Sequence, residues 1–233
     1  MNATYCGPAP LPGDLWTSWN FDPPLLVALA ILGAAMWRKP AGLAAVAVLT
    51  LAFVSPLCAL SSALFSARVV HHVLLVAVAA PLLARALPAR RPGGLALPFA
   101  LSTLVLWAWH VPSAYDIALA NVAIYWAMQI TLILSAAWFW RAVMAAGRSP
   151  IEQLGTVVAA FAQMGMLGAL LTFAPEAIYA AHAAAPFAWG LTPLQDQQLG
   201  GLLMWVPAGI PYAVVAAYLA RGRWTRFAER AAC

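Results

Sequence analysis

Apolar runs that recur along the chain constrain its fold more than any other feature of the sequence. There are about seven, separated by short polar or basic breaks, and most approach the roughly 20 residues that a helix needs to cross a bilayer. They are continuous rather than alternating, which favours helices over barrel strands because backbone groups in lipid must be satisfied internally. The expected spans are residues 23–37, 43–64, 69–87, 95–110, 118–143, 154–173 and 199–219.

Composition agrees with this interpretation. Hydrophobic residues make up 64% of the 233 and charged residues only 8%, which a soluble domain could not carry on its surface. We therefore predict an all-α, polytopic membrane helical bundle of about seven transmembrane helices. The net charge of +5 is spread over the ends of the runs, so we expect membrane lipid and no nucleic acid as a partner.

The basic residues predict the orientation. With the amino terminus outside, alternation of seven spans places eleven of the twelve Lys and Arg residues inside, Arg90 and Arg91 among them, and only Arg68 outside. We therefore expect an N-out/C-in, multi-pass protein of a bacterial cytoplasmic membrane. Residues 1–22 would form an extracytoplasmic segment, residues 23–220 the seven-helix domain and residues 221–233 a basic cytoplasmic tail.

The three cysteines predict no covalent or metal framework. Cys6, Cys58 and Cys233 are far apart in the sequence and form no CxxC pair, so neither a disulfide framework nor a thiolate metal site is expected. Cys58 is interpreted as a small buried hydrophobic residue.

Histidines provide the strongest indication of a functional site. The predicted topology places all four on the outer side, and ionisable groups near hydrocarbon are costly enough to indicate a function; they are His71, His72, His110 and His182. Adjacent helical residues point about 100° apart, so His71 and His72 can face one ligand only if the helix is irregular there.

A metal-binding histidine needs an acceptor for its second nitrogen, and Asp116 and Asp196 are the candidates on the same side. The paired glycines Gly200 and Gly201 should let another helix approach and bring Asp196 near the histidines. Simpler interpretations exist: His72 or His110 as a hydrogen-bonding or interfacial residue, and His182 as a solvated loop residue. Three methionines are either soft donors or ordinary packing, namely Met164, Met166 and Met204.

Several blocks of the sequence resemble the CtaG family of cytochrome c oxidase assembly factors, the polytopic kind associated with caa-type oxidases. The blocks are Ser66–Leu83, Trp107–Asn121, Phe139–Trp140, Gly168–Pro175 with Tyr179, and Asp196–Pro207. The residues that match the shared pattern are His72, His110, Tyr115, Asp116, Asp196 and Gln197. The chain departs from the pattern at two places. At Arg68 the family usually has a histidine. Near the middle of the fifth expected span the family has another histidine, where this chain has Tyr125, Trp126 and Gln129.

The resemblance implies a seven-helix plasma-membrane protein without catalytic activity that is needed for oxidase maturation and is suspected to supply copper. The implied partners are subunits of a haem-copper oxidase and a periplasmic copper chaperone. We expect an assembly factor, not an enzyme, that presents copper at the outer face and holds no haem. The candidate metal ligands and their supports are His72, His110, His71, His182, Asp196 and Asp116.

Two alternatives stay open at this point. The first is a b-type membrane cytochrome in which His72 and His110 are the axial ligands of a single haem. The second is a metal-free structural chaperone that grips an oxidase subunit through its small-residue helix faces.

Overall fold

The computed structural model describes residues 4–88 and 93–231, and the predicted inner-side arginines Arg90 and Arg91 lie outside these ranges. The described residues form helices and connecting turns, with an isolated bridge between Thr4 and Gly7 and no strand. The all-α prediction is therefore confirmed. The elements in chain order are η1 (Pro12–Thr17), α1 (Pro23–Met36), α2 (Pro40–Val54), α3 (Pro56–Ala63), α4 (Phe65–Val73), η2 (Leu74–Ala79), α5 (Ala80–Ala86), α6 (Ala96–Ala108), α7 (Pro112–Ala120), α8 (Val122–Val143), α9 (Pro150–Thr172), η3 (Ala180–His182), η4 (Ala185–Trp189), α10 (Pro193–Trp205) and α11 (Gly209–Ala231).

Length and hydropathy identify the helices that are able to cross a membrane. Within the described residues there are four, namely Phe65–Ala86, Val122–Val143, Pro150–Thr172 and Pro193–Arg221. The pair α2 and α3, bent by 49°, makes a fifth if it counts as one span. The apolar helices α1 and α6 have 14 and 13 residues, a length of about 20 Å that falls short of a core of about 30 Å. The chain is therefore a helical membrane protein with four or five candidate spans, and the seven crossings stay a prediction.

Every expected apolar run contains a helix, but local chemistry divides several of them. Pro56 has no N–H and its ring clashes with the carbonyl four residues earlier, so α2 ends at Val54 and Ser55 caps α3 by accepting from Leu57 N. In the same way, the side chain of Asn121 accepts from the first amides of α8 and separates it from α7. The run expected over residues 118–143 therefore starts as a separate short helix.

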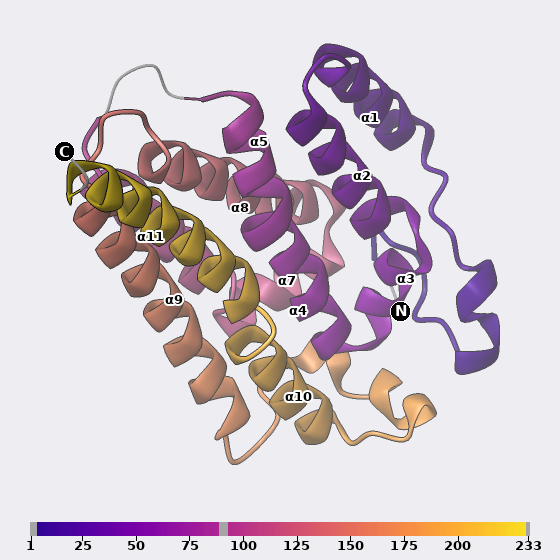
Figure 1. Ribbon diagram of the computed structural model, residues 1–233. Coiled ribbons are helices and arrows are strands. Elements are labelled where there is room, and N and C mark those ends of the chain that lie inside the picture. Colours follow the sequence, from indigo (N-terminus) through magenta and orange to yellow (C-terminus); the bar gives the residue numbers. More distant parts are fainter. Residues whose placement is uncertain (1–3, 89–92, 232–233) are drawn as a thin grey trace.

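The stretch from α4 through η2 to α5 runs through the middle of the bundle, with α2 to one side and α8, α10 and α11 around it (Figure 1). It is the most buried of the four candidate spans. A Cβ on Gly201 would lie 2.5 Å from the carbonyl oxygen of Gly168, and one on Gly200 would lie 2.6 Å from the ring of Phe65. The paired glycines therefore let α10 lie against α9 and α4, as predicted.

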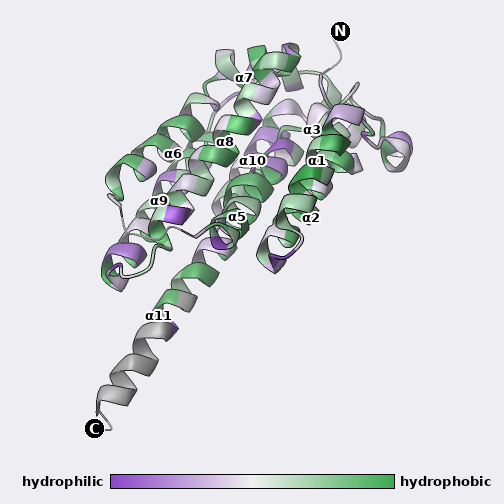
Figure 2. Ribbon diagram, turned by 90° about the horizontal axis from the view of Figure 1, so that it is seen from above, coloured by the Kyte–Doolittle hydropathy of each residue, from purple (hydrophilic) through white to green (hydrophobic). Residues whose placement is uncertain are grey.

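The two ends of the chain lie at opposite ends of the bundle (Figure 2). Hydrophobic residues cover much of the length of the helices between them, and α11 extends away toward the carboxyl terminus. This arrangement is compatible with an odd number of crossings.

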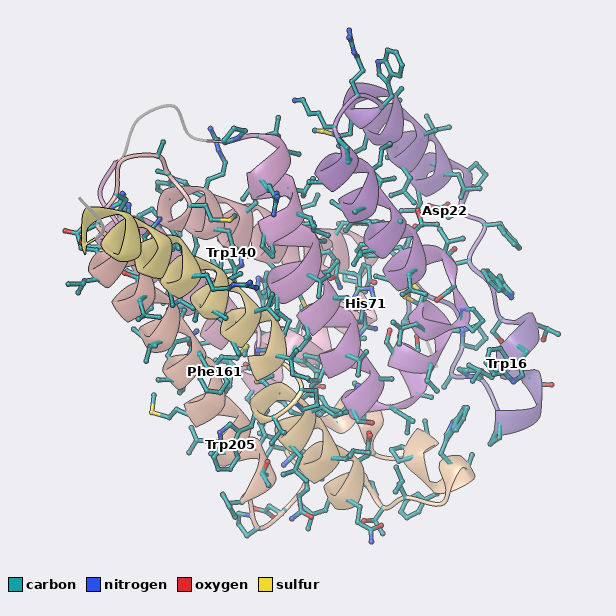
Figure 3. All side chains as sticks on the ribbon, viewed as in Figure 1. Trp16, Asp22, His71, Trp140, Phe161 and Trp205 are labelled. Carbon is teal, nitrogen blue, oxygen red and sulfur yellow. A yellow bond between two sulfur atoms is a disulfide. The ribbon has the colours of Figure 1, made fainter. Side chains whose placement is uncertain are left out.

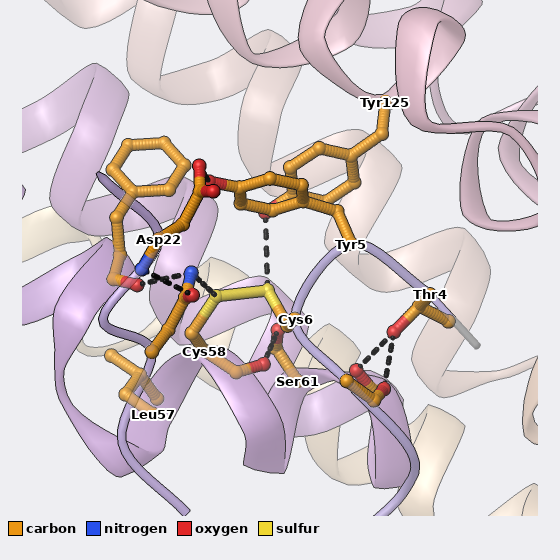
Figure 4. Close-up of a disulfide and its surroundings, with 12 residues drawn as sticks. Thr4, Tyr5, Cys6, Asp22, Leu57, Cys58, Ser61 and Tyr125 are labelled. Atoms are coloured by element: carbon orange, nitrogen blue, oxygen red, sulfur yellow. Dashed lines mark hydrogen bonds between the residues drawn. A yellow bond between two sulfur atoms is a disulfide. The ribbon is translucent and has the colours of Figure 1, made fainter. Parts of the chain in front are cut away.

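A disulfide ties the amino-terminal segment to α3 and corrects the prediction made from cysteine spacing. Cys6 and Cys58 are bonded, with a sequence separation of 52 and a distance of 5.2 Å between their Cα atoms (Figure 4). Around the bond, Asn20 donates to the carbonyl of Phe53 and Tyr5 donates to the carboxylate of Asp22. Cys58 is fully buried, as expected, but as half of a cross-link. The spacing gave no indication of it, because the pairing depends on how the amino-terminal segment folds back over α3.

Candidate functional site

The buried side of α4 carries three ionisable residues within two turns. Arg68 and His71 are completely buried and His72 is 3% exposed. Spacings of three and four residues put both histidines on the same side of the helix as Arg68. The two imidazole rings lie 5.8 Å apart between centroids. Both histidines therefore reach the interior, although they are adjacent in the sequence.

The helix becomes irregular directly after these histidines. The segment Leu74–Ala79 (η2) is a π-helix, a rare form that is frequently found at functional sites. One of its carbonyls, that of Val76, accepts from the indole N–H of Trp140 at 2.9 Å. Both histidines lie within the regular helix α4, so the irregular helix start expected for two inward-facing neighbours is not what the structure shows, and the π-helical segment begins two residues after His72.

Arg68 is a buried cation without a counter-ion among the described residues. Its Nη1 donates to the hydroxyl of Tyr125 at 3.3 Å, and its Cζ lies 5.3 Å from the centre of that ring. Its Nε and Nη2 have no hydrogen-bond partner. The ion pair seen in the described part of the chain joins Arg148 to Glu152 instead. Arg68 therefore keeps its charge in the interior with only partial compensation.

Two further buried side chains also lack hydrogen-bond partners, His71 on α4 and Gln129 on α8. Neither ring nitrogen of His71 is hydrogen-bonded, and the ring packs edge-to-face on Phe53 with centroids 4.8 Å apart. Figure 3 shows His71 near the middle of the bundle. Gln129 follows Tyr125 by one turn of α8, and neither atom of its amide group has a partner. We call Arg68, His71, His72 and Gln129 the unpartnered cluster.

His72 and His110 form a second contact at the edge of this cluster. Their ring centroids lie 6.2 Å apart, and the Nε2 of His72 has no partner. The Nδ1 of His110 lies 2.7 Å from the carbonyl oxygen of Leu106, so it donates there and leaves Nε2 with a free lone pair. With metal–nitrogen bonds of about 2.0 Å, two imidazoles that share one ion have centroids roughly 5–6 Å apart. The pair is therefore close to the spacing of a shared metal ion.

His182 is buried and fully engaged, which corrects the interpretation as a solvated loop residue. It is 3% exposed, its Nε2 lies 2.7 Å from the hydroxyl of Tyr115, and its Nδ1 lies 3.3 Å from the carbonyl oxygen of Ala63. Burial, together with the nearby charge of Arg68, lowers the pKa of His182 to about 4. Both ring nitrogens are therefore used within the fold.

The two aspartates bind backbone amides rather than histidines. Asp196 accepts from Phe65 N, Ser66 N and the Ser66 hydroxyl at the start of α4. Asp116 accepts from the amides of Ala180 and Ala181. Free N–H groups at the start of a helix attract a carboxylate, which explains the position of Asp196. The expected role of these residues in orienting a histidine is not what the structure shows.

Gln197, like the two aspartates, forms side-chain hydrogen bonds to backbone groups. Its side chain accepts from Ile178 N and donates to the carbonyls of Leu171 and Glu176.

Within the described ranges, no three His, Cys, Asp or Glu side chains are grouped closely enough to hold a metal ion. Of the six predicted metal-site residues, the structure brings His71, His72 and His110 together in a row and places the other three in structural contacts.

The three candidate methionines lie in the hydrophobic core or at the surface. Met164 and Met204 are buried in the hydrophobic core, and Met166 is 55% exposed. Gln129, by contrast, belongs to the cluster, and Tyr125 contacts Arg68. Both were noted in the sequence only as departures from a pattern. A buried amide inside an apolar membrane run is the signal that points to Gln129.

Comparison with known protein families identifies a match over much of the chain. A family model described as cytochrome c oxidase caa3 assembly factor matches residues 95–226, which is more than half of the chain. The match includes His110 and Asp196, whereas Arg68, His71 and His72 precede it. No curated protein and no solved structure matches the chain significantly. The chain therefore belongs to the family of cytochrome c oxidase caa3 assembly factors.

Proposed function

We propose that this assembly factor holds cuprous copper between His72 and His110 and presents it to an oxidase subunit at the outer face of the membrane. The observation that carries the proposal is the contact of these two buried rings, 6.2 Å apart, with Nε2 of His72 unpartnered. His71 is a third donor, since both of its nitrogens are free. Copper is a cargo in this proposal, and no catalytic step is attached to it.

The donor set suits a transferable ion. Neutral imidazole is a good ligand for copper, and a cuprous ion accepts two or three donors. Within the described ranges no thiolate takes part, because the sulfurs of Cys6 and Cys58 are bonded to each other; Cys233 lies outside these ranges. Affinity without thiolates should be modest, so that the ion can be passed on.

The disulfide supports the outer position of the site. Disulfides persist in oxidising compartments, which for a bacterial membrane protein means the outer side. The Sγ of Cys6 lies 3.3 Å from the hydroxyl of Tyr125, which in turn accepts from Arg68. The cross-link and the histidines of α4 therefore lie in the same part of the bundle. The predicted excess of basic residues at the opposite side agrees with this orientation.

Copper content measured by elemental analysis tests the proposal. The full-length protein, purified in mild detergent, is loaded anaerobically with cuprous ion beside a His72→Ala/His110→Ala double variant. We expect about one copper per chain in the parent and a large loss in the double variant. A His182→Gln variant is the matched control: it should keep its copper, because both nitrogens of His182 are already engaged.

The alternatives give different results in the same preparation. Equal and low copper in parent and double variant would contradict the proposal. If oxidase assembly then survived the double substitution, a metal-free chaperone would be the better description. A Soret band that disappears in the double variant would identify a haem between the same two histidines.

A further inference from the structure

We propose that Arg68 binds a small carboxylate-type oxyanion inside the bundle, independently of any copper. Arg68 is 0% exposed and its Nε and Nη2 have no partner. A buried charge is strongly unfavourable in a bundle surrounded by hydrocarbon unless it is paired. The hydroxyl and ring of Tyr125 contact one edge of the guanidinium, and the hydroxyl of Tyr115 also interacts with Arg68, but both groups are neutral and leave the charge unbalanced.

No carboxylate of the fold fills this role among the described residues. Asp196 approaches α4 but uses its oxygens on Phe65 and Ser66 at the start of the helix. That contact neutralises the positive end of the helix dipole, not the arginine one turn later. Asp116 is occupied by two loop amides. The charge of Arg68 therefore remains to be balanced by a bound species.

The free edge of Arg68 defines the class of that species. Nε and Nη2 carry two parallel N–H groups on one side of the planar guanidinium, while Nη1 is directed to Tyr125. Two parallel donors match the two coplanar oxygens of a carboxylate and form the bidentate pair that arginine favours. A single spherical anion such as chloride does not use this geometry.

Neighbouring side chains complete the site with neutral donors. A neutral His71 offers one ring N–H, and Gln129 offers its amide N–H groups; both are buried and unpartnered. Their oxygens and lone pairs add no negative charge that would repel an anion. The unpartnered atoms therefore share one explanation, which is a planar oxyanion held by Arg68 with support from His71 or Gln129.

Formate, the smallest carboxylate, is the probe that tests this site. The thermal midpoint of the full-length protein in mild detergent is measured against sodium formate, with sodium chloride at equal ionic strength as the control. We expect formate to raise the midpoint by several degrees more than chloride. Arg68→Met should abolish this difference, and Arg68→Lys should weaken formate binding about tenfold, because a point charge replaces the fork.

A second variant keeps the test decisive if Arg68→Met does not fold. Gln129→Glu places a carboxylate on α8 opposite Arg68, one turn from the tyrosine that Arg68 contacts. It should be more stable than the matched Gln129→Met variant and should no longer respond to formate. Three results would overturn the proposal: a shift of the thermal midpoint that is equal for chloride and formate, a shift that survives Arg68→Met or Gln129→Glu unchanged, or no shift at all. The last result would mean that water alone occupies the site.

Discussion

The polar residues around α4 and the start of α10 fall into two groups that differ in what they bind. Asp116, His182, Asp196 and Gln197 are each engaged by backbone or side-chain hydrogen bonds within the fold. The unpartnered cluster is as deeply buried as His182, Asp196 and Gln197 but has free donors and acceptors. Native proteins rarely leave buried polar atoms unsatisfied, so a concentration of them needs an explanation.

The difference separates residues that hold the fold from residues that are available for a ligand. The engaged group ties loops and helix starts together: Asp196 joins α10 to α4, and Gln197 joins α10 to the end of α9. The unpartnered cluster lies on α4 and α8, inside the frame that the first group builds. Removing a residue of the first group should therefore cost stability, whereas the second group should affect binding more than folding.

The largest expected effect is at Asp196. Replacing it with alanine leaves three buried donors of Phe65 and Ser66 without an acceptor. We expect a loss of about 4 kcal/mol in the free energy of unfolding, because unpaired buried donors and a lost charge-assisted contact both contribute. Equilibrium unfolding in mixed micelles measures it, with Asp14→Ala at an exposed position as the control. A loss as small as that of the control would contradict the structural role.

A pH dependence is expected from His182. Its pKa is about 4 in the folded chain, against about 6.5 for an unperturbed histidine, because the neutral form is buried. As the pH falls from 6.5 to 4 the unfolded chain takes up a proton and the folded chain does not, so the free energy of unfolding falls. The loss attributable to His182 is roughly 3 kcal/mol and is complete near pH 4.

Unfolding of the parent and of His182→Gln across pH 4 to 7 checks this dependence. The variant should have a flatter profile in this window, whatever its absolute stability. Identical slopes in the two proteins would mean that His182 is not buried in its neutral form.

A matched pair of glutamines compares the two groups directly. Gln129 and Gln197 are both 1% exposed, but only Gln197 has hydrogen-bond partners for its amide. Gln197→Leu should lose about 2 kcal/mol because it strands the Ile178 amide and two carbonyls, whereas Gln129→Leu should gain about 1 kcal/mol by removing an unsatisfied amide. Unfolding of both variants under one condition gives the difference. Equal losses would show that Gln129 is satisfied in the folded protein.

The sequence was sufficient for some of these features and not for others, for physical reasons. Helical class and the approximate positions of the apolar runs follow from composition and periodicity, and Gly200–Gly201 correctly predicted a close helix approach. The division of α2 from α3 follows from Pro56, whose effect on a helix is local and which lies inside the run expected over residues 43–64. The roles of Asp196 and Cys58 depend on partners 131 and 52 residues away. No local pattern records such partners.

The candidate site shows the same limit. Clustering of histidines on one side was predictable from topology, and three of them do lie in a row. Whether a polar side chain is engaged or free depends on distances of less than one ångström between helices, which no sequence pattern specifies. His182 and His71 are both histidines near the same end, yet one has two partners and the other has none.

The smallest expected effect links the two proposed ligands and depends on both proposals. The charge of Arg68 opposes a cuprous ion at His72, one turn further along α4, and a carboxylate bound to Arg68 would cancel that charge. Formate should therefore raise copper affinity about fivefold, a coupling of about 1 kcal/mol, and copper should raise formate affinity by the same factor. Copper titrations with and without formate measure it. Arg68→Met should bind copper more tightly than the parent, and its copper affinity should not depend on formate. If the parent binds each ligand alone but shows no coupling between them, the two sites are too far apart to share the electrostatic environment of α4.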